Sequence, residues 1–246
     1  MNLMRITESV VDFTKLESEQ KHHFFATMQA FDQQIFPNST PDEIYELVHD
    51  VDAVSVQVVH YYHHDKLIGQ NVIPILKLFL QDKPIFVLSS RAGILPAYRK
   101  RNRALNTAIR VAINYRIRHA AIPLWFVPTV IQPKIYTLFA SRSQNFFPRE
   151  GRRIPEEYLQ VLDMIQQRKS EVQKRREDIF VHPSVMPQTT PADIQRLRNK
   201  ATPHINFFTQ HVPDYFDGMG LMCVCKLDLK TISEAIFNLW LDRHVY

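Results

Sequence analysis

The chain has 246 residues, a formal net charge of +5 at pH 7 and an isoelectric point of about 9.2. Hydrophobic residues make up 45% of it, which is enough for a buried core and excludes an intrinsically disordered chain. The basic excess, concentrated in 91–118 and 149–176, favours an anionic partner; because aromatic residues do not interleave with it, we expect no nucleic-acid partner.

The cysteine spacing and the hydropathy pattern indicate in which cellular compartment the protein works. Cys223 and Cys225 are separated by one residue, a poor spacing for a disulfide, and a reducing compartment fits. The first 13 residues lack the apolar region of a signal peptide, and the apolar stretch Leu67–Leu80 is too short and too polar to span a bilayer. We therefore predict a cytoplasmic protein with no membrane span and no metal site.

The first half of the chain predicts two helices followed by a meander. Helical spacing of apolar residues predicts a helix over Ser18–Phe36. Thr40-Pro41-Asp42-Glu43 has the pattern of an N-cap, a first-turn proline and a capping box, so a second helix runs to about His49. Strands are expected over Ala53–Tyr62, Leu67–Leu80 and Pro84–Ser90, with Pro74 favouring an edge position or a bulge.

The second half is less regular. A long amphipathic helix should run to His119, followed by a buried strand and a short helix. The remaining elements are predicted as a charged surface helix, a linker, a helix, a strand and a helix. In chain order, the segments after His119 are Ala121–Ile131, Pro133–Ser143, Pro155–Asp178, Phe180–Pro191, Pro191–His211, Met219–Asp228 and Leu229–Asp242.

One motif joins the third strand of the meander to the long helix. Its sequence is Ile94-Leu95-Pro96-Ala97-Tyr98-Arg99-Lys100-Arg101-Asn102-Arg103-Ala104. The first amides of a helix have no partner inside it, and that end of the helix carries partial positive charge. A strand, a basic turn and a helix start therefore predict a site for phosphate groups.

The motif resembles the V-x-P-x-Y-R-x-x-G-x-G/A motif of the GNAT superfamily of acyl-CoA-dependent acyltransferases. The matching positions are Ile94, Pro96, Tyr98, Arg99, Asn102 and Ala104. Asn102 replaces the first motif glycine, and asparagine tolerates left-handed backbone geometry better than most residues. The order of predicted elements over 1–147 is also similar to the GNAT order.

This resemblance implies an α/β fold with a mixed sheet, a GNAT-like acyltransferase fold with a C-terminal extension. A GNAT-like acyl-CoA-binding domain would occupy 1–150, and a mostly helical extension over 151–246 would complete or cover it. The fold class would make the chain a transferase, an N-acetyltransferase in the first instance.

The resemblance also implies the ligands and the reaction. An acyl group, in the first instance acetyl, would pass from acetyl-CoA or another acyl-CoA to the amine of a small molecule or protein, in a monomer or a homodimer. Tyr136 on the short helix would be the catalytic acid for the departing thiolate. The cofactor-binding residues would be Ala92, Gly93, Ile94, Arg99, Lys100, Arg101, Asn102, Arg103 and Ala104.

The residues leave alternatives open. Tyr136 fits equally well as a half-buried core tyrosine, and Arg99 could pair with a carboxylate instead of a phosphate. His60, His63 and His64 cluster near a strand end, where solvated histidines are favoured over a zinc site. No general base is evident. The chain could therefore be a GNAT-like binding or regulatory protein without activity, or an acyl-CoA-dependent signal synthase.

Overall fold

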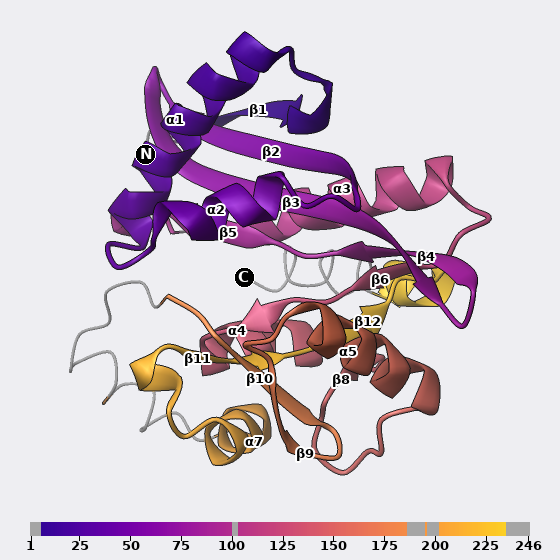
Figure 1. The fold of residues 1–246 in the computed structure, drawn as a ribbon. Helices are drawn as coiled ribbons and strands as arrows, with labels where there is room; N and C mark the ends of the chain where they lie inside the picture. The colour runs from indigo at the N-terminus through magenta and orange to yellow at the C-terminus, as the bar shows by residue number, and fades with distance from the viewer. Residues whose placement is uncertain (1–5, 100–102, 186–194, 196–201, 235–246) are drawn as a thin grey trace. The chain divides into compact units, whose positions relative to one another are not determined.

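A computed structural model of the chain describes residues 6–99, 103–185, 195 and 202–234, and shows a mixed α/β fold (Figure 1). The chain packs as two units. Unit 1 comprises Met1–Leu78 and Phe86–Ala120, and unit 2 comprises Phe79–Ile85 and Ala121–Tyr246. None of the helices in the described part of the chain is long and apolar enough to cross a membrane.

Unit 1 is built on a sheet whose strands follow the order β1-β2-β3-β4, with β5 pairing to β3. The expected antiparallel meander is confirmed, and β1 is an addition that the sequence analysis missed. Its side chains are partly or largely exposed, so it lacks the alternating apolar pattern of a half-buried strand. The strands are β1 (Ile6–Asp12), β2 (Ala53–His63), β3 (Lys66–Leu80), β4 (Lys83–Leu88) and β5 (Arg91–Ile94).

Helices α1 (Ser18–Ile35) and α2 (Pro41–Val48) match the predicted pair, and the capping box of Thr40 and Glu43 is formed. Met28 of α1 and Ile44 of α2 are buried against strand residues such as Val58, in one hydrophobic cluster. The third helix, α3 (Arg103–Arg118), also follows the prediction.

The side chains of β3 show that α1 and α3 contact opposite faces of the unit 1 sheet. Gln70 Nε2 donates to the Met28 carbonyl in α1, at 3.2 Å, and Asn71 Nδ2 donates to the Ala104 carbonyl in α3, at 3.3 Å. Successive side chains of a strand point to opposite faces. The sheet therefore lies between these two helices.

Pro74 lies inside β3, which is a central strand and not the edge strand expected from this proline. The Ser89 N–H donates to the Pro74 carbonyl at 3.3 Å, in continuation of the β3–β5 register. Because proline has no N–H, it cannot return a hydrogen bond to Ser89. The hydrogen bond that Pro74 cannot donate is therefore missing opposite Ser89, between the end of β4 and the beginning of β5.

Unit 2 contains two sets of paired strands. One set follows the order β6-β12-β8 and the other β7-β11-β10-β9. Phe146-Phe147 and part of the predicted strand Met219–Asp228 pair in the first set. The strands are β6 (Leu124–Phe126), β7 (Thr129–Val130), β8 (Phe146–Phe147), β9 (Gln173–Arg176), β10 (Ile179–Pro183), β11 (Met219–Met222) and β12 (Val224–Lys226).

Two predicted strands, Ala121–Ile131 and Met219–Asp228, are each divided in two. Strand β7 pairs with β11 and β6 pairs with β12, both antiparallel and in the same register. Between these two pairs, the Cys223 N–H donates to the Pro128 carbonyl at 2.9 Å. Pro128 has no N–H to complete the ladder at that point, which explains the division of this pair.

The predicted charged helix over Pro155–Asp178 is wrong beyond its first half. Helix α5 (Glu156–Arg168) ends early, and β9 then pairs with β10 as a hairpin. The expected linker over Phe180–Pro191 begins with β10, in which Ile179, Phe180 and Val181 are buried. Those apolar residues are stabilised as a strand because they enter the core of unit 2.

Helix α4 (Pro133–Ala140) is shorter than predicted. Helix α7 (Pro203–His211) begins after its N-cap Thr202, and the helix expected from Leu229 is described as far as residue 234. Most of the predicted segment Pro191–His211 before α7 lies outside the described residues. The division of the chain into functional parts at residue 150 stays a prediction.

A close approach between α1 and β5 generates a test of this packing. A methyl group added at Gly93 would lie 2.7 Å from Ile35 Cγ2. We expect Gly93→Ala to lower the free energy of unfolding by about 1–3 kcal/mol, the usual cost of overpacking a core. Urea denaturation of Gly93→Ala, Ile35→Ala and the double variant measures this. The double variant should lose less free energy of unfolding than the sum of the two single losses. Additive losses would contradict a contact between position 93 and Ile35.

Candidate functional site

Strand β5 has one paired edge and one edge that no strand covers among the described residues. The Leu95 N–H donates to the Ile68 carbonyl at 2.9 Å, and Gly93 pairs with Gln70 two residues earlier. Hydrogen-bonded positions alternate along an antiparallel strand. The N–H groups of Ala92 and Ile94 therefore point away from β3, toward the open edge.

A hydrogen bond from Arg99 agrees with this orientation of the Ile94 backbone. The Arg99 Nε donates to the Ile94 carbonyl at 2.8 Å, on the edge of β5 away from β3. Arg99 is exposed, and its terminal Nη groups have no hydrogen bond within the described residues. An exposed guanidinium is the type of group that binds a phosphate through paired hydrogen bonds.

The start of α3 is tied to the sheet by polar contacts. The Ala104 carbonyl accepts from Asn71 Nδ2 at 3.3 Å, and Thr107 Oγ1 donates to Glu8 Oε1 at 3.2 Å. Arg110 forms an ion pair with the same Glu8 carboxylate. These bonds fix the first turns of α3, whose N-terminal amides are the predicted partners of a phosphate.

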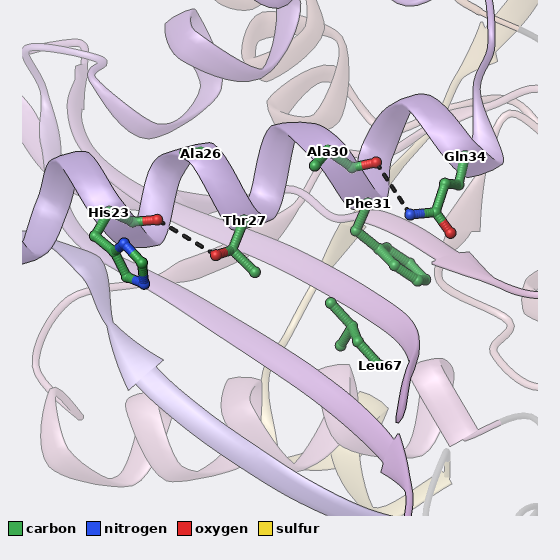
Figure 2. A pocket seen from close by; sticks show the side chains of 7 residues that line it. All are labelled: His23, Ala26, Thr27, Ala30, Phe31, Gln34 and Leu67. Carbon is green, nitrogen blue, oxygen red and sulfur yellow. Dashed lines mark hydrogen bonds between the residues drawn. The ribbon is translucent and has the colours of Figure 1, made fainter. Parts of the chain in front are cut away.

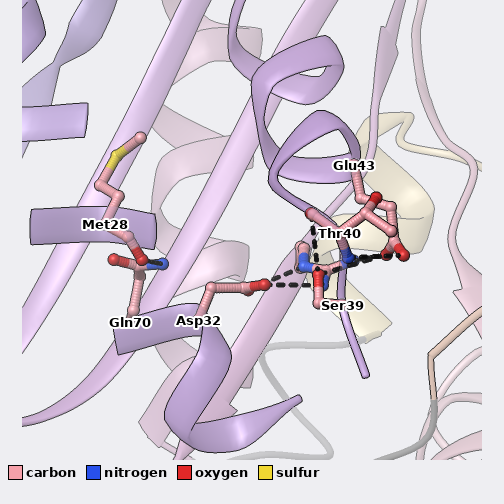
Figure 3. A network of polar contacts seen from close by, with 7 residues as sticks. Met28, Asp32, Ser39, Thr40, Glu43 and Gln70 are labelled. Carbon is pink, nitrogen blue, oxygen red and sulfur yellow. Dashed lines mark hydrogen bonds and ion pairs between the residues drawn. The ribbon is translucent and has the colours of Figure 1, made fainter. Parts of the chain in front are cut away.

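A partly buried ion network fixes the first residue of β5, and Figure 3 labels its two carboxylates, Asp32 and Glu43. Arg91 donates from Nε and Nη2 to both oxygens of Asp32, at 2.8 and 2.7 Å, and from Nη1 to Glu43 at 3.0 Å. Asp32 is 4% exposed, and the guanidinium lies 4.6 Å above the Phe36 ring. Two-pronged contacts of this kind hold geometry firmly, so β5 is held to α1 and α2.

The sequence favoured solvated histidines near the end of β2, which holds for the exposed His64 but not for His60. His60 is 2% exposed, its Nε2 lies 2.9 Å from Gln70 Oε1, and burial lowers its pKa. Since Gln70 Oε1 only accepts, Nε2 must carry the proton. His63 instead contacts the motif, with Nδ1 3.3 Å from the Tyr98 hydroxyl. Among the residues that the structure describes, no three His, Cys, Asp or Glu side chains converge on a possible metal.

Tyr136 lies in unit 2 and is fully buried, among Phe146, Phe207 and Phe208. Its hydroxyl donates to the Pro148 carbonyl at 2.7 Å. Burial, as the main cause, raises the pKa of Tyr136 far above that of a free phenol. These contacts are those of the core tyrosine that the sequence left as an alternative. The catalytic role of Tyr136 stays a prediction.

A groove of about 420 Å³ lies between α1 and the start of β3 (Figure 2). No acidic side chain and no Lys or Arg lines it, and it contains none of the predicted cofactor residues. Its lining consists of His23, Ala26, Thr27, Ala30, Phe31, Gln34 and Leu67.

The structure brings part of the predicted cofactor set together in unit 1. Ala92, Gly93 and Ile94 form β5, and Arg99 and Ala104 lie at the two described ends of the motif turn. Lys100, Arg101 and Asn102 lie outside the described residues, and of Arg103 only the helical backbone is described. Sequence reasoning missed Asn71 and Arg91, which hold these elements. An amide inside an apolar strand was the available signal for Asn71.

No model of a known protein family and no curated protein matches the sequence. Solved structures show distant likenesses. An Enterococcus faecalis protein described as a probable N-acyltransferase matches 57% of this chain and 32% of its own, at 9% identity and a TM-score of 0.39. This chain thus spans about a third of that protein's length.

Two further likenesses cover most of the other chain. Escherichia coli ElaA matches 62% of this chain and 95% of its own, at 13% identity and a TM-score of 0.39. An Arabidopsis thaliana protein solved with a bisubstrate analogue containing CoA matches 61% and 93%, at 11% identity and a TM-score of 0.38.

The burial of Tyr136 generates a test. We expect Tyr136→Phe to lower the free energy of unfolding by about 1–3 kcal/mol, because the buried Pro148 carbonyl would lose its donor. Chemical denaturation measures the change, with the 52% exposed Tyr45 as control, where Tyr45→Phe should cost less than about 0.5 kcal/mol. Equal stability of Tyr136→Phe and the unaltered protein would contradict the structural role of this hydroxyl.

Proposed function

We propose that the chain is a divergent GNAT-type N-acyltransferase that binds acyl-CoA along the open edge of β5 and at the start of α3. The observation that carries the proposal is the coincidence of sequence motif and backbone. The residues that match the GNAT motif begin at the end of β5, where backbone N–H groups are unpaired by strands, and end in the first turn of α3.

The described residues fit an acyl-CoA. The N–H groups of Ala92 and Ile94 face an open edge and can donate to the carbonyls of an extended chain lying beside β5. Arg99 is exposed at the end of that edge, its Nη groups make no hydrogen bond to the described residues, and α3 starts four residues later. A guanidinium and a helix N-terminus together favour a pyrophosphate.

The chemistry expected of this site is positioning and polarisation. Bound acyl-CoA supplies an activated thioester. An N–H at Ala92 or Ile94 that donates to the thioester carbonyl would stabilise negative charge on that oxygen as the acceptor amine approaches. The Arg91 ion network and the Gly93 contact with Ile35 hold β5 still, so the donors need no reorganisation.

The finer parts of the proposal are the acyl group and the acceptor. We propose acetyl as the first acyl group to test and a primary amine, of a small molecule or a protein, as the acceptor. Tyr136 is left out of the mechanism because its hydroxyl is buried and donates to Pro148. A cytoplasmic location, where acyl-CoA is available, belongs to the same proposal.

Calorimetric titration with acetyl-CoA tests the cofactor site. We expect micromolar binding that weakens by about 10- to 100-fold in Arg99→Ala, because hydrogen bonds to charged groups are worth about 1.5–3 kcal/mol. Arg118→Ala is the matched control, since it removes the same charge from an exposed residue at the other end of α3. Arg118→Ala should bind like the unaltered protein.

The second measurement is release of free CoA thiol in the presence of a panel of amines. Thiol release that depends on both acetyl-CoA and an amine supports acyl transfer. Tight binding without thiol release from any amine would instead support a GNAT-like binding protein. Absence of acetyl-CoA binding would overturn the proposed function.

A further inference from the structure

Asn71 is the one side chain that bonds both to the strand break and to the start of α3 in the described part of unit 1. It is fully buried in the central strand β3. Its Oδ1 accepts from Ser90 Oγ at 2.7 Å, and its Nδ2 donates to the Ala104 carbonyl at 3.3 Å. The acceptor half and the donor half of the amide are thus both engaged.

The two bonds reach both parts of the proposed acyl-CoA site. Ser90 precedes β5 directly, in the gap that Pro74 leaves between β4 and β5. Ala104 lies in the first turn of α3, where the amides for a phosphate begin. A neutral carboxamide can accept from one side and donate to the other, which an apolar side chain of the same shape cannot do.

We infer that Asn71 is a positioning residue of the acyl-CoA site, which sets the distance between the β5 amides and the start of α3. This inference rests on the proposed function. Asn71 touches neither cofactor nor acceptor in this account and acts through Ser90 and Ala104. Its removal should therefore lower the affinity for acetyl-CoA and loosen the first turns of α3.

The neighbouring Gln70 provides a matched control. It is 3% exposed, lies on the opposite face of the same strand, and also makes two hydrogen bonds, to His60 and to the Met28 carbonyl. Loss of its amide should disturb the core to a similar degree. None of its bonds reaches Ser90 or α3.

The experiment compares Asn71→Leu with Gln70→Met, each an apolar residue of similar shape. Acetyl-CoA affinity is measured by calorimetry, and amide hydrogen exchange of residues 107–110, which bond to the first-turn carbonyls of α3, by mass spectrometry. We expect Asn71→Leu to weaken binding by about tenfold or more and to speed exchange there. Gln70→Met should stay within about twofold on both readouts.

Ser90→Ala serves if Asn71→Leu does not fold. It removes one of the two bonds with little change in volume and should weaken binding by about threefold. Equal effects of the Asn71 and Gln70 variants on binding and exchange would overturn the inference, as would a binding loss with unchanged exchange over 107–110. Absence of acetyl-CoA binding in the unaltered protein would refute the proposed function and, with it, the role of Asn71 in cofactor binding. The exchange comparison would then still show whether Asn71 holds the first turns of α3.

Discussion

Pro74 lies in the central strand β3 and has no N–H to donate to the strand opposite it. The position of the candidate site depends on this missing hydrogen-bond donor. Pro74 of β3 accepts from Ser89 but cannot return a hydrogen bond, so the strand opposite it divides into β4 and β5. Buried backbone groups must find partners. Beyond the division, β5 pairs on its β3 side, which leaves the N–H groups of Ala92 and Ile94 toward an edge that no strand covers among the described residues.

Polar side chains on both faces of the unit 1 sheet keep this edge in place. On the α1 face, Arg91 holds β5 through Asp32, which is buried, and Glu43, which is partly exposed. On the α3 face, Asn71 connects Ser90 with Ala104. Desolvation offsets much of the attraction within buried ion pairs, so their net contribution to stability is small. The contribution of these side chains here is geometric: they set where β5 and α3 lie.

Local patterns in the sequence predicted the local structure well. The capping box at Thr40, the meander and the helix after the motif were confirmed because short-range geometry determines them. The sequence alone did not predict features set by tertiary pairing. Pro74 indicated an edge strand because its partner strands were unknown, and β1 gave no pattern because it is held mainly by backbone bonds to β2. Tyr136 illustrates the same limit, since only packing shows what its hydroxyl contacts.

Residue-resolved amide exchange by NMR, with and without acetyl-CoA, tests the central claim that the open edge of β5 binds the acyl-CoA. Without ligand, the Gly93 amide should exchange slowly, because it bonds to β3, while the Ala92 and Ile94 amides should exchange fast. With acetyl-CoA, both fast amides should become protected. Unchanged exchange at Ala92 and Ile94 under saturating acetyl-CoA would contradict the account.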